Sequence, residues 1–254
     1  MDLNTQVALI TGGGSGLGAA TAQHFAELGA KIAVLDLNLE AAKAIAEPLG
    51  GCAIAADVSD EAAVDAAIER ATQELGQAPR VAVNCAGIAP AARIVDREGK
   101  GSASVFESTL KVNLFGTYHV MTHAARRMMA LDPMDTGERG VIINTASIAY
   151  QDGQLGQTAY AASKGAIAAM CLPAAREFAR TGIRVMAIAP GLFRTPMMEA
   201  LPQEVTDKIA SNIPFPARLG APQEYARTAA QIVENTYLNG TTLRLDGAVR
   251  LPPK

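Results

Sequence analysis

Residues 7–18, VALITGGGSGLG, change from an apolar run into a glycine-rich turn. The run Val7–Thr11 has the composition of a short buried strand, and an alanine-rich amphipathic stretch from about Ala19 to Leu28 follows the glycines. Strand, glycine turn and helix in this order predict a dinucleotide site. Glycines let the backbone approach a pyrophosphate, and the N-terminus of the helix offers free N–H groups and the positive end of its dipole.

The spacing of the glycines is G-x-x-x-G-x-G, which differs from the common G-x-G-x-x-G pattern. A flexible surface loop is therefore the alternative interpretation, although the strand before it and the helix after it argue against a loop. The glycines that we expect to line the pyrophosphate site are Gly12, Gly16 and Gly18.

A second apolar run, Lys31–Asp36, ends in a carboxylate eighteen residues beyond Gly18. An acidic residue at this position accepts hydrogen bonds from the adenosine ribose hydroxyls and repels a 2′-phosphate. Leu37 and Asn38 follow, so no neighbouring lysine or arginine is available to hold that phosphate. The sequence favours NAD over NADP. Capping of the next helix is the alternative role, and it suits Asn38 better than Asp36.

Strand and helix patterns alternate along the whole chain. The predicted strands are 7–11, 31–35, 52–56, 80–84, 140–146, 183–189 and 241–245; the predicted helices are 17–28, 38–48, 60–75, 104–130, 157–181 and 222–235. Such alternation is typical of a parallel sheet covered by helices on both faces. With 254 residues, the chain is predicted to be one α/β domain of the Rossmann type, over residues 1–254, with a doubly wound sheet of about seven strands. The segments 93–103 and 132–139 are expected to be surface excursions.

Composition restricts the partners. A net charge of −3 argues against nucleic acid or an anionic membrane as the main partner, and no apolar stretch of about 18 residues predicts a membrane span. No secretory signal is apparent, so a cytoplasmic protein is expected. The cysteines are odd in number and scattered, and predict neither a disulfide framework nor a metal site: Cys52, Cys85 and Cys171. The histidines are assigned no catalytic part: His24, His119 and His123.

Polar and small residues follow the predicted strands at their carboxyl ends, where ligands bind in sheets of this kind. They are Asp36, then Asp57 and Val58, then Asn84, Cys85, Ala86 and Gly87, then Ser147, then Pro190 and Gly191. Asp57 is placed to accept a hydrogen bond from the adenine amino group, and beginning a helix cap is its alternative role. Five successive strand ends of this type indicate one shared site.

Tyr160 and Lys164 stand four residues apart, which puts their side chains on one face of a helix. A free tyrosine has a pKa of about 10, and a nearby lysine cation favours the phenolate. Lowering that pKa by about 3 units requires about 4 kcal/mol of differential interaction. The tyrosine then exchanges a proton with an alcohol or ketone at working pH, and Ser147 is placed to bond the same substrate oxygen. Chance pairing of the two residues on a helix is the alternative.

Together these motifs resemble the short-chain dehydrogenase/reductase family. They are T-G-x3-G-x-G at Thr11 to Gly18, N-x-A-G at Asn84 to Gly87, Asn113, Ser147, Tyr160-x3-Lys164 and Pro190-Gly191. The resemblance extends from Val7 to about Gly247, and implies one Rossmann domain, a dinucleotide cofactor and hydride transfer at a carbinol carbon. It implies that Tyr160 is the general acid/base and Lys164 holds the ribose hydroxyls. Ser147 would orient the substrate oxygen, and Asn113 would support a proton relay through water.

The same resemblance implies a set of contacts to NAD. These residues are Ser15, Leu17, Asp36, Asp57, Val58, Cys85, Tyr160, Lys164, Phe193 and Thr195. Thr195, five residues past Pro190, is expected to bond the nicotinamide carboxamide.

The second half of the chain resembles the subgroup of this family that acts on 3-hydroxyacyl-CoA. The matching stretches are 141–147 (VIINTAS), 182–186 (GIRVM), 189–193 (APGLF), 214–220 (PFPARLG) and 243–248 (LRLDGA). The resemblance implies NAD-dependent oxidation of (S)-3-hydroxyacyl-CoA by a homo-oligomer, expected to be a tetramer. The apolar loop 192–201, with Phe193, Met197 and Met198, is expected to cover the acyl chain. The alternatives are a family member acting on a steroid, a sugar or another secondary alcohol, and a dinucleotide-binding protein without catalysis.

Overall fold

The computed structural model describes residues 1–199 and 203–253. Its strands are β1 (Val7–Thr11), β2 (Lys31–Asp36), β3 (Cys52–Ala55), β4 (Val81–Asn84), β5 (Gly140–Thr145), β6 (Ile183–Pro190) and β7 (Thr242–Leu245). They form one seven-stranded sheet in the order β3-β2-β1-β4-β5-β6-β7, with every neighbouring pair parallel. The predicted doubly wound Rossmann-type α/β fold is confirmed.

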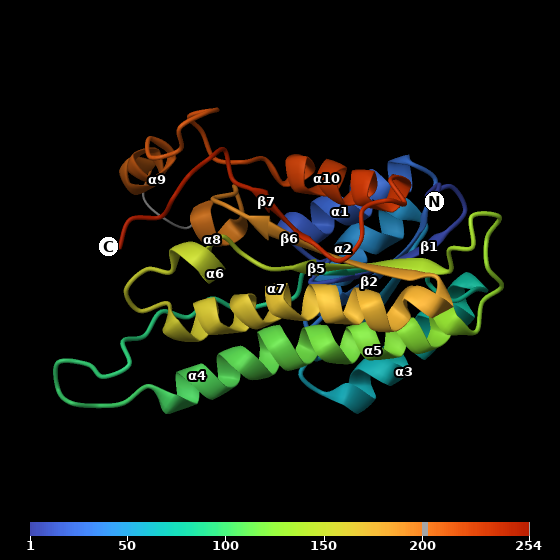
Figure 1. Cartoon of the computed structure of the whole chain (residues 1–254), viewed down its shortest axis with the longest axis horizontal. Helices are drawn as coiled ribbons and strands as arrows, with labels where there is room; N and C mark the ends of the chain where they lie inside the picture. Colours follow the sequence, from blue (N-terminus) through green and yellow to red (C-terminus); the bar gives the residue numbers. More distant parts are fainter. Residues whose placement is uncertain (200–202, 254) are drawn as a thin grey trace.

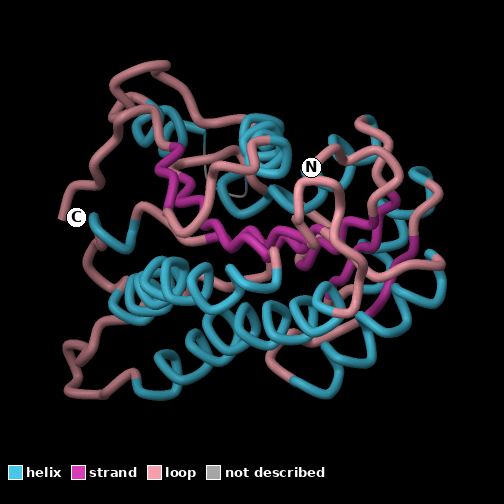
Figure 2. Tube along the Cα trace, turned by 45° about the vertical axis from the view of Figure 1, so that its right-hand side comes forward, coloured by secondary structure: helices cyan, strands magenta, loops and turns pink. Residues whose placement is uncertain are grey.

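Helices cover both faces of this sheet (Figure 1). On one side lie α1 (Gly16–Glu27), α2 (Leu39–Ala46) and α10 (Pro222–Glu234). On the other lie α3 (Glu61–Leu75), α4 (Ala103–Leu110), α5 (Gly116–Met129) and α7 (Thr158–Phe178). Figure 2 shows the strands as the middle layer between these helices. No helix of the described residues has the length and hydropathy needed to cross a bilayer.

The strands are buried because helices pack on both of their faces. Successive side chains of a strand point to opposite sides of the sheet. Accordingly, Leu9 and Ile142 join the core cluster under α3, α5 and α7, while Ile10 and Ile143 join the cluster under α1, α2 and α10. Strands buried on both faces read as nearly continuous apolar runs. This is why the strands could be recognised in the sequence without an alternating pattern.

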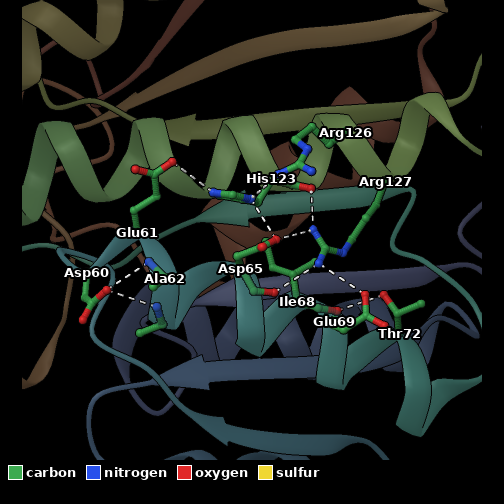
Figure 3. Close-up of polar contacts among 11 residues, drawn as sticks. Asp60, Glu61, Ala62, Asp65, Ile68, Glu69, Thr72, His123, Arg126 and Arg127 are labelled. Carbon is green, nitrogen blue, oxygen red and sulfur yellow. Dashed lines mark hydrogen bonds and ion pairs between the residues drawn. The ribbon is translucent and has the colours of Figure 1, made fainter.

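A network of ion pairs fastens α5 to α3 (Figure 3). Nδ1 of His123 lies 2.9 Å from Oδ1 of Asp65, and its Nε2 lies 3.3 Å from Oε1 of Glu61. Arg127 reaches the same Asp65 oxygen at 2.8 Å and Glu69 at 3.3 Å. The side chain of His123 is only 7% exposed, so the network fixes the packing of the two helices. This placement gives His123 a structural role.

The helix predicted over 104–130 contains an interruption that its sequence pattern does not show. Between α4 and α5, a π-helical turn, η2, spans Lys111–Phe115 and carries Asn113. A π-helical turn within a helix is uncommon and occurs often at functional sites. Nothing in the residue types of this segment marks the change from one helical turn to the other, so the sequence predicted only a continuous helix.

The connections contain short elements that the sequence analysis did not predict. They are α6 (Ala149–Asp152) after β5, and α8 (Pro196–Glu199) and α9 (Gln203–Ala210) after β6. The short turns η1 (Glu47–Leu49) and η3 (Ala179–Thr181) form the ends of the helices predicted over 38–48 and 157–181. The segment 93–103 is mostly a surface excursion, pinched by a bridge between Val95 and Gly101, and Ala103 already begins α4. The segment 132–139 is a loop before β5.

Candidate active site

A groove of about 570 Å³ opens at the carboxyl ends of β1, β2 and β4. The strand order reverses between β1 and β4, and ligands of doubly wound sheets bind at such a switch point. The predicted cofactor contacts that line this groove are Gly12, Ser15, Gly16, Leu17, Gly18, Asp36, Asp57, Val58, Cys85, Ala86, Gly87 and Thr195.

The glycine turn at the entrance to α1 needs glycine for steric reasons. Gly12 has a φ of +61°, and a Cβ there would lie 2.7 Å from the backbone nitrogen of Ala86. A Cβ on Gly18 would collide with the carbonyl oxygen of Gly12. Ser15, the N-cap of α1, makes no capping hydrogen bond through its hydroxyl, and no acidic residue lies in the first turn. These features fit a bound pyrophosphate.

The Asp36 carboxylate is held in place at the end of β2. One oxygen accepts a hydrogen bond from the backbone N–H of Gly14 at 3.0 Å, and the other accepts from that of Asn38 at 2.9 Å. Asn38 is the residue that caps α2, as expected. The side chain of Leu37 is 76% exposed, and no lysine or arginine is among the described residues lining the groove. The groove therefore presents an uncompensated carboxylate where the ribose is expected.

Asp57 lines the groove and does not cap the following helix. Its Oδ1 accepts a hydrogen bond from the N–H of Ser59 at 2.9 Å, which closes a local turn. The N-cap of α3 is Asp60. Nδ1 of His119 lies 3.0 Å from the carbonyl oxygen of Val58, so α5 supports this wall of the groove.

The structure places the side chain of Asn84 between β4 and β5, and its contact with the cofactor stays a prediction. Its side chain is 3% exposed and lines neither the groove nor the neighbouring cavity. Its Nδ2 donates to Oδ1 of Asn144 at 2.9 Å, which ties the end of β4 to β5. Asn84 thus positions the stretch Cys85–Gly87 that follows it. The sequence could not separate this role from direct contact, since both place an asparagine at the strand end.

A cavity of about 290 Å³ continues from the groove and contains three of the four predicted catalytic residues, Ser147, Tyr160 and Lys164. Cys85 and Thr195 line both spaces. The predicted site residues in the cavity wall are Leu17, Cys85, Gly87, Ser147, Tyr160, Lys164, Pro190, Phe193 and Thr195. The lining also includes residues that the sequence analysis missed, among them Gln154, Gln157 and Leu251. No pattern marked them, because glutamine and leucine are common on protein surfaces and in cores.

Tyr160 and Lys164 lie on the first turns of α7. Nζ of Lys164 lies 5.8 Å from the centre of the Tyr160 ring and donates a hydrogen bond to the carbonyl oxygen of Thr145 at 2.7 Å. Burial lowers the pKa of Lys164 to about 8. Burial also raises the pKa of Tyr160 above its usual value. The hydrogen bond from Ser147 lowers this pKa, but by less than burial raises it.

The direction for Tyr160 differs from the sequence expectation, which was a tyrosine pKa lowered by the lysine cation. A low-dielectric surrounding disfavours the charged form of both groups. In the protein alone burial is the largest influence on the pKa of each group, and it is opposed by the hydrogen bond from Ser147 at Tyr160 and by Cys85 at Lys164. A Tyr160 phenolate at neutral pH therefore requires more stabilisation than the hydrogen bond from Ser147 provides.

Ser147 follows β5 and faces the cavity. Its Oγ accepts a hydrogen bond from the backbone N–H of Ala149 at 3.2 Å, at the start of α6. Its one hydroxyl proton is directed at Tyr160 in the protein alone, and would have to turn to a substrate oxygen that binds beside that tyrosine.

Asn113 lies behind the cavity wall. The side chain is fully buried; its Oδ1 accepts from the N–H of Ile88 at 2.8 Å, and its Nδ2 donates to the Ile88 carbonyl at 2.9 Å and to Oγ of Ser163 at 3.0 Å. Ile88 lines both the groove and the cavity. Asn113 thus fixes the loop after β4 to α7, and its part in a proton relay stays a prediction.

Phe193 forms the fixed base of the loop after β6. It is 6% exposed, packs in the core cluster that contains α10, and forms a bridge with Gly220. A Cβ on Gly220 would lie 2.8 Å from the Phe193 ring. The side chain of Met198 packs beside Ile148 at the cavity. In the predicted cover 192–201, the side chain of Met197 and residues 200–201 lie outside what the structure describes.

A buried polar cluster lies beneath the cavity. The hydroxyl of Tyr225, on α10, lies 2.7 Å from Oγ1 of Thr145, and Sγ of Cys85 lies 3.7 Å from each of these oxygens. Burial raises the pKa of the Cys85 thiol, so this side chain is a neutral member of the wall. Tyr225 was not recognised from the sequence because its helix is far from the motifs along the chain.

A dinucleotide groove that opens into a cavity with serine, tyrosine and lysine defines a nicotinamide-dependent oxidoreductase. The chain belongs to the short chain dehydrogenase family, whose model matches residues 6–206. It is 49% identical over 251 residues to the 3-hydroxyacyl-CoA dehydrogenase type-2 of Bos taurus, covering 97% of this chain and 96% of that protein. The protein of the same name from Homo sapiens is 49% identical over 252 residues, with 97% and 96% covered. A crystal structure of 3-hydroxyacyl-CoA dehydrogenase type-2 from Mycobacterium avium matches with a TM-score of 0.93 and 42% identity, covering 100% of this chain and 98% of the other.

Proposed function

We propose that this chain is a 3-hydroxyacyl-CoA dehydrogenase that oxidises (S)-3-hydroxyacyl-CoA to 3-ketoacyl-CoA with NAD, a step of fatty acid metabolism. The observation that carries the proposal is the 49% sequence identity, over nearly the whole chain, to relatives that are named 3-hydroxyacyl-CoA dehydrogenase type-2. The complete set of Ser147, Tyr160 and Lys164 in one cavity supports it.

In this proposal the Ser147 hydroxyl donates a hydrogen bond to the substrate oxygen and holds it near Tyr160. The phenolate form of Tyr160 accepts the hydroxyl proton as general base. A bound nicotinamide supplies the hydride acceptor for the carbinol carbon. Loss of one proton and one hydride converts the alcohol to the ketone. Lys164 contributes its ammonium charge within the same buried space and hydrogen-bonds the Thr145 carbonyl, which keeps it directed at the end of β5.

The choice of NAD over NADP rests on the Asp36 carboxylate. It stands at the ribose end of the groove, already oriented by Gly14 and Asn38. A 2′-phosphate there would face a negative charge with no lysine or arginine among the described lining residues. Ribose hydroxyls, which donate hydrogen bonds, suit the carboxylate instead.

Two other functions are tested against this one. A related dehydrogenase acting on a steroid, a sugar or another secondary alcohol would use the same three side chains. A dinucleotide-binding protein without catalysis would bind NADH and oxidise no alcohol. Steady-state NADH formation with a panel of (S)- and (R)-3-hydroxyacyl-CoA thioesters, steroids and sugar alcohols separates them. We expect the highest kcat/KM with an (S)-thioester; a higher value for another class would overturn the substrate assignment.

We also propose that the protein works as a homotetramer in the cytoplasm. Support for assembly comes from large apolar side chains exposed on the layer of α4, η2, α5 and α7: Phe106, Phe115, Tyr118, Met129 and Leu172. Support for a reducing compartment comes from three cysteines with free thiols. Light scattering should give a mass four times 26.3 kDa, and a monomer mass would contradict the tetramer. Cell fractionation should recover the protein in the soluble cytoplasmic fraction.

A further inference from the structure

Residues 249–253, which follow β7, lie along one side of the catalytic cavity. In Figure 1 this red stretch runs past α6 and α9, at the end of the molecule where the loops after β5 and β6 lie. Leu251 lines the cavity together with Tyr160 and Gln157, from which it is far apart in sequence. The segment therefore contributes to a wall that the catalytic motifs do not specify.

The segment is anchored before Leu251. Val249 is fully buried and packs with Ile148, Ile213 and Leu219 in a small apolar cluster next to the cavity. The guanidinium group of Arg244 donates to the Val249 carbonyl at 3.3 Å. The same group pairs with Asp152 at 2.7 Å and Asp246 at 2.7 Å, so it links α6 to the end of β7.

The segment is also anchored after Leu251. The backbone N–H of Leu155 donates to the carbonyl of Pro253 at 3.1 Å. Nε2 of Gln154 donates to the carbonyl of Pro252 at 3.1 Å. Gln154 itself lines the cavity. With hydrogen bonds on both sides of it, Leu251 has a defined position.

Leu251 is an apolar side chain at a cavity that also holds polar catalytic groups. It is partly buried and packs against the cluster of Ile148 and Val249, beside Met198 and Leu192 from the loop after β6. Leu251, Ile148, Met198 and Leu192 line the same cavity as Ser147 and Tyr160. Apolar side chains beside catalytic groups are suited to the hydrocarbon part of a substrate.

We propose that Leu251 is a specificity-determining residue whose side chain limits the length of acyl chain that the cavity accepts. The inference rests on the proposed function, since it takes the substrate to be an acyl thioester. Its physical basis is shape: a hydrophobic pocket discriminates by the methylenes that it has room for. Removing most of the Leu251 side chain leaves room for a longer chain, and a larger side chain takes room away.

The test compares Leu251→Ala and Leu251→Phe with the unchanged protein in NADH-dependent reduction of acetoacetyl-CoA and 3-ketododecanoyl-CoA. We expect Leu251→Ala to raise the ratio of kcat/KM for the long over the short substrate at least about threefold, and Leu251→Phe to lower it similarly. Leu155→Ala is the matched control, because Leu155 is 59% exposed and does not line the catalytic cavity. It should leave the ratio unchanged.

The outcomes separate this inference from the function on which it rests. Suppose that the unchanged protein reduces both thioesters and that the Leu251 variants change kcat/KM for both by the same factor. Then Leu251 does not control the preference for chain length, and the inference is wrong. If the unchanged protein reduces neither thioester, the proposed function and the inference fall together. NADH affinity, measured by fluorescence titration, shows whether each variant is folded. The two variants change the side-chain volume at position 251 in opposite directions, so if one fails to fold, the other still tests the inference.

Discussion

Nζ of Lys164 lies 5.8 Å from the centre of the Tyr160 ring, and at the cavity the lysine side chain is buried and the tyrosine side chain partly buried. Burial has opposite effects on their pKa values: it lowers that of the ammonium to about 8 and raises that of the phenol. Each shift favours the neutral form. With a pKa of about 8, Lys164 is still mostly protonated at neutral pH, whereas the Tyr160 phenol is neutral there, and both states have measurable consequences.

The first consequence concerns stability against pH. Unfolded Lys164 keeps its proton up to about pH 10.5, whereas the folded side chain loses it near pH 8. Between these values the unfolded state binds more protons, so the free energy of unfolding rises with pH. Between pH 8 and 10, the free energy of unfolding of the wild type, measured by denaturant titration, should rise by up to about 2 kcal/mol relative to that of Lys164→Met.

Tyr160 contributes with the opposite sign, since its raised pKa lowers stability as pH rises past 10, where the unfolded tyrosine ionises. The measurement therefore stops at pH 10. Lys100→Met, which removes an exposed lysine, is the control and should track wild type. If the difference in the free energy of unfolding between wild type and Lys164→Met stays constant across this pH range, burial does not destabilise the charged form of Lys164 and the prediction is wrong.

Replacing the general acid/base should separate catalysis from binding. Tyr160→Phe keeps the ring that lines the cavity and removes only the proton carrier, so turnover should be lost while NADH affinity changes less than about threefold. Lys164→Ala should reduce both turnover and NADH affinity, because the lysine is predicted to hold the ribose hydroxyls of the cofactor and to favour the phenolate form of Tyr160. Fluorescence titration and steady-state rates measure the two effects. Tyr237→Phe, at a side chain that is 98% exposed, is the control. A Phe variant at position 160 that retains more than about a tenth of the wild-type rate would contradict the assignment.

Cofactor preference should follow the carboxylate of Asp36. We expect kcat/KM for NAD to exceed that for NADP at least about tenfold, equivalent to roughly 1.4 kcal/mol. Asp36→Asn removes the charge that repels a 2′-phosphate, so it should lower the ratio of kcat/KM for NAD to that for NADP. Asp57→Asn makes the same chemical change elsewhere in the groove and should affect the ratio less. Equal use of both cofactors by the wild type would refute the prediction.

Asn113 should matter for stability as well as for catalysis. Asn113→Ala removes hydrogen bonds to the N–H and carbonyl of Ile88 and leaves these partly buried groups without their partners. The free energy of unfolding should fall by about 2–4 kcal/mol, and NADH should bind more weakly because Ile88 lines the groove. Asn4→Ala, at an exposed asparagine, is the control. Unchanged stability together with lost activity would instead favour a purely catalytic role.

The sequence predicted the features that depend on local pattern. Gly12 and Gly18 are required by close backbone approach, and Asp36 ends a strand, so each is visible in a run of a dozen residues. Features that depend on tertiary packing were missed or misjudged. The spacing of Tyr160 and Lys164 showed their proximity but not the burial that controls their ionisation. Leu251 is held at the cavity by tertiary contacts from Arg244, the cluster around Val249, and Gln154 and Leu155, which no local pattern shows.

The most direct test of the proposed function is the reduction of acetoacetyl-CoA by NADH, followed as loss of NADH absorbance near neutral pH. We predict rapid oxidation of NADH that Tyr160→Phe abolishes. We also predict that the equilibrium shifts toward oxidation of 3-hydroxyacyl-CoA as pH rises, because that oxidation releases a proton. An enzyme that leaves acetoacetyl-CoA untouched while it turns over a steroid, a sugar or a simple secondary alcohol would contradict the account.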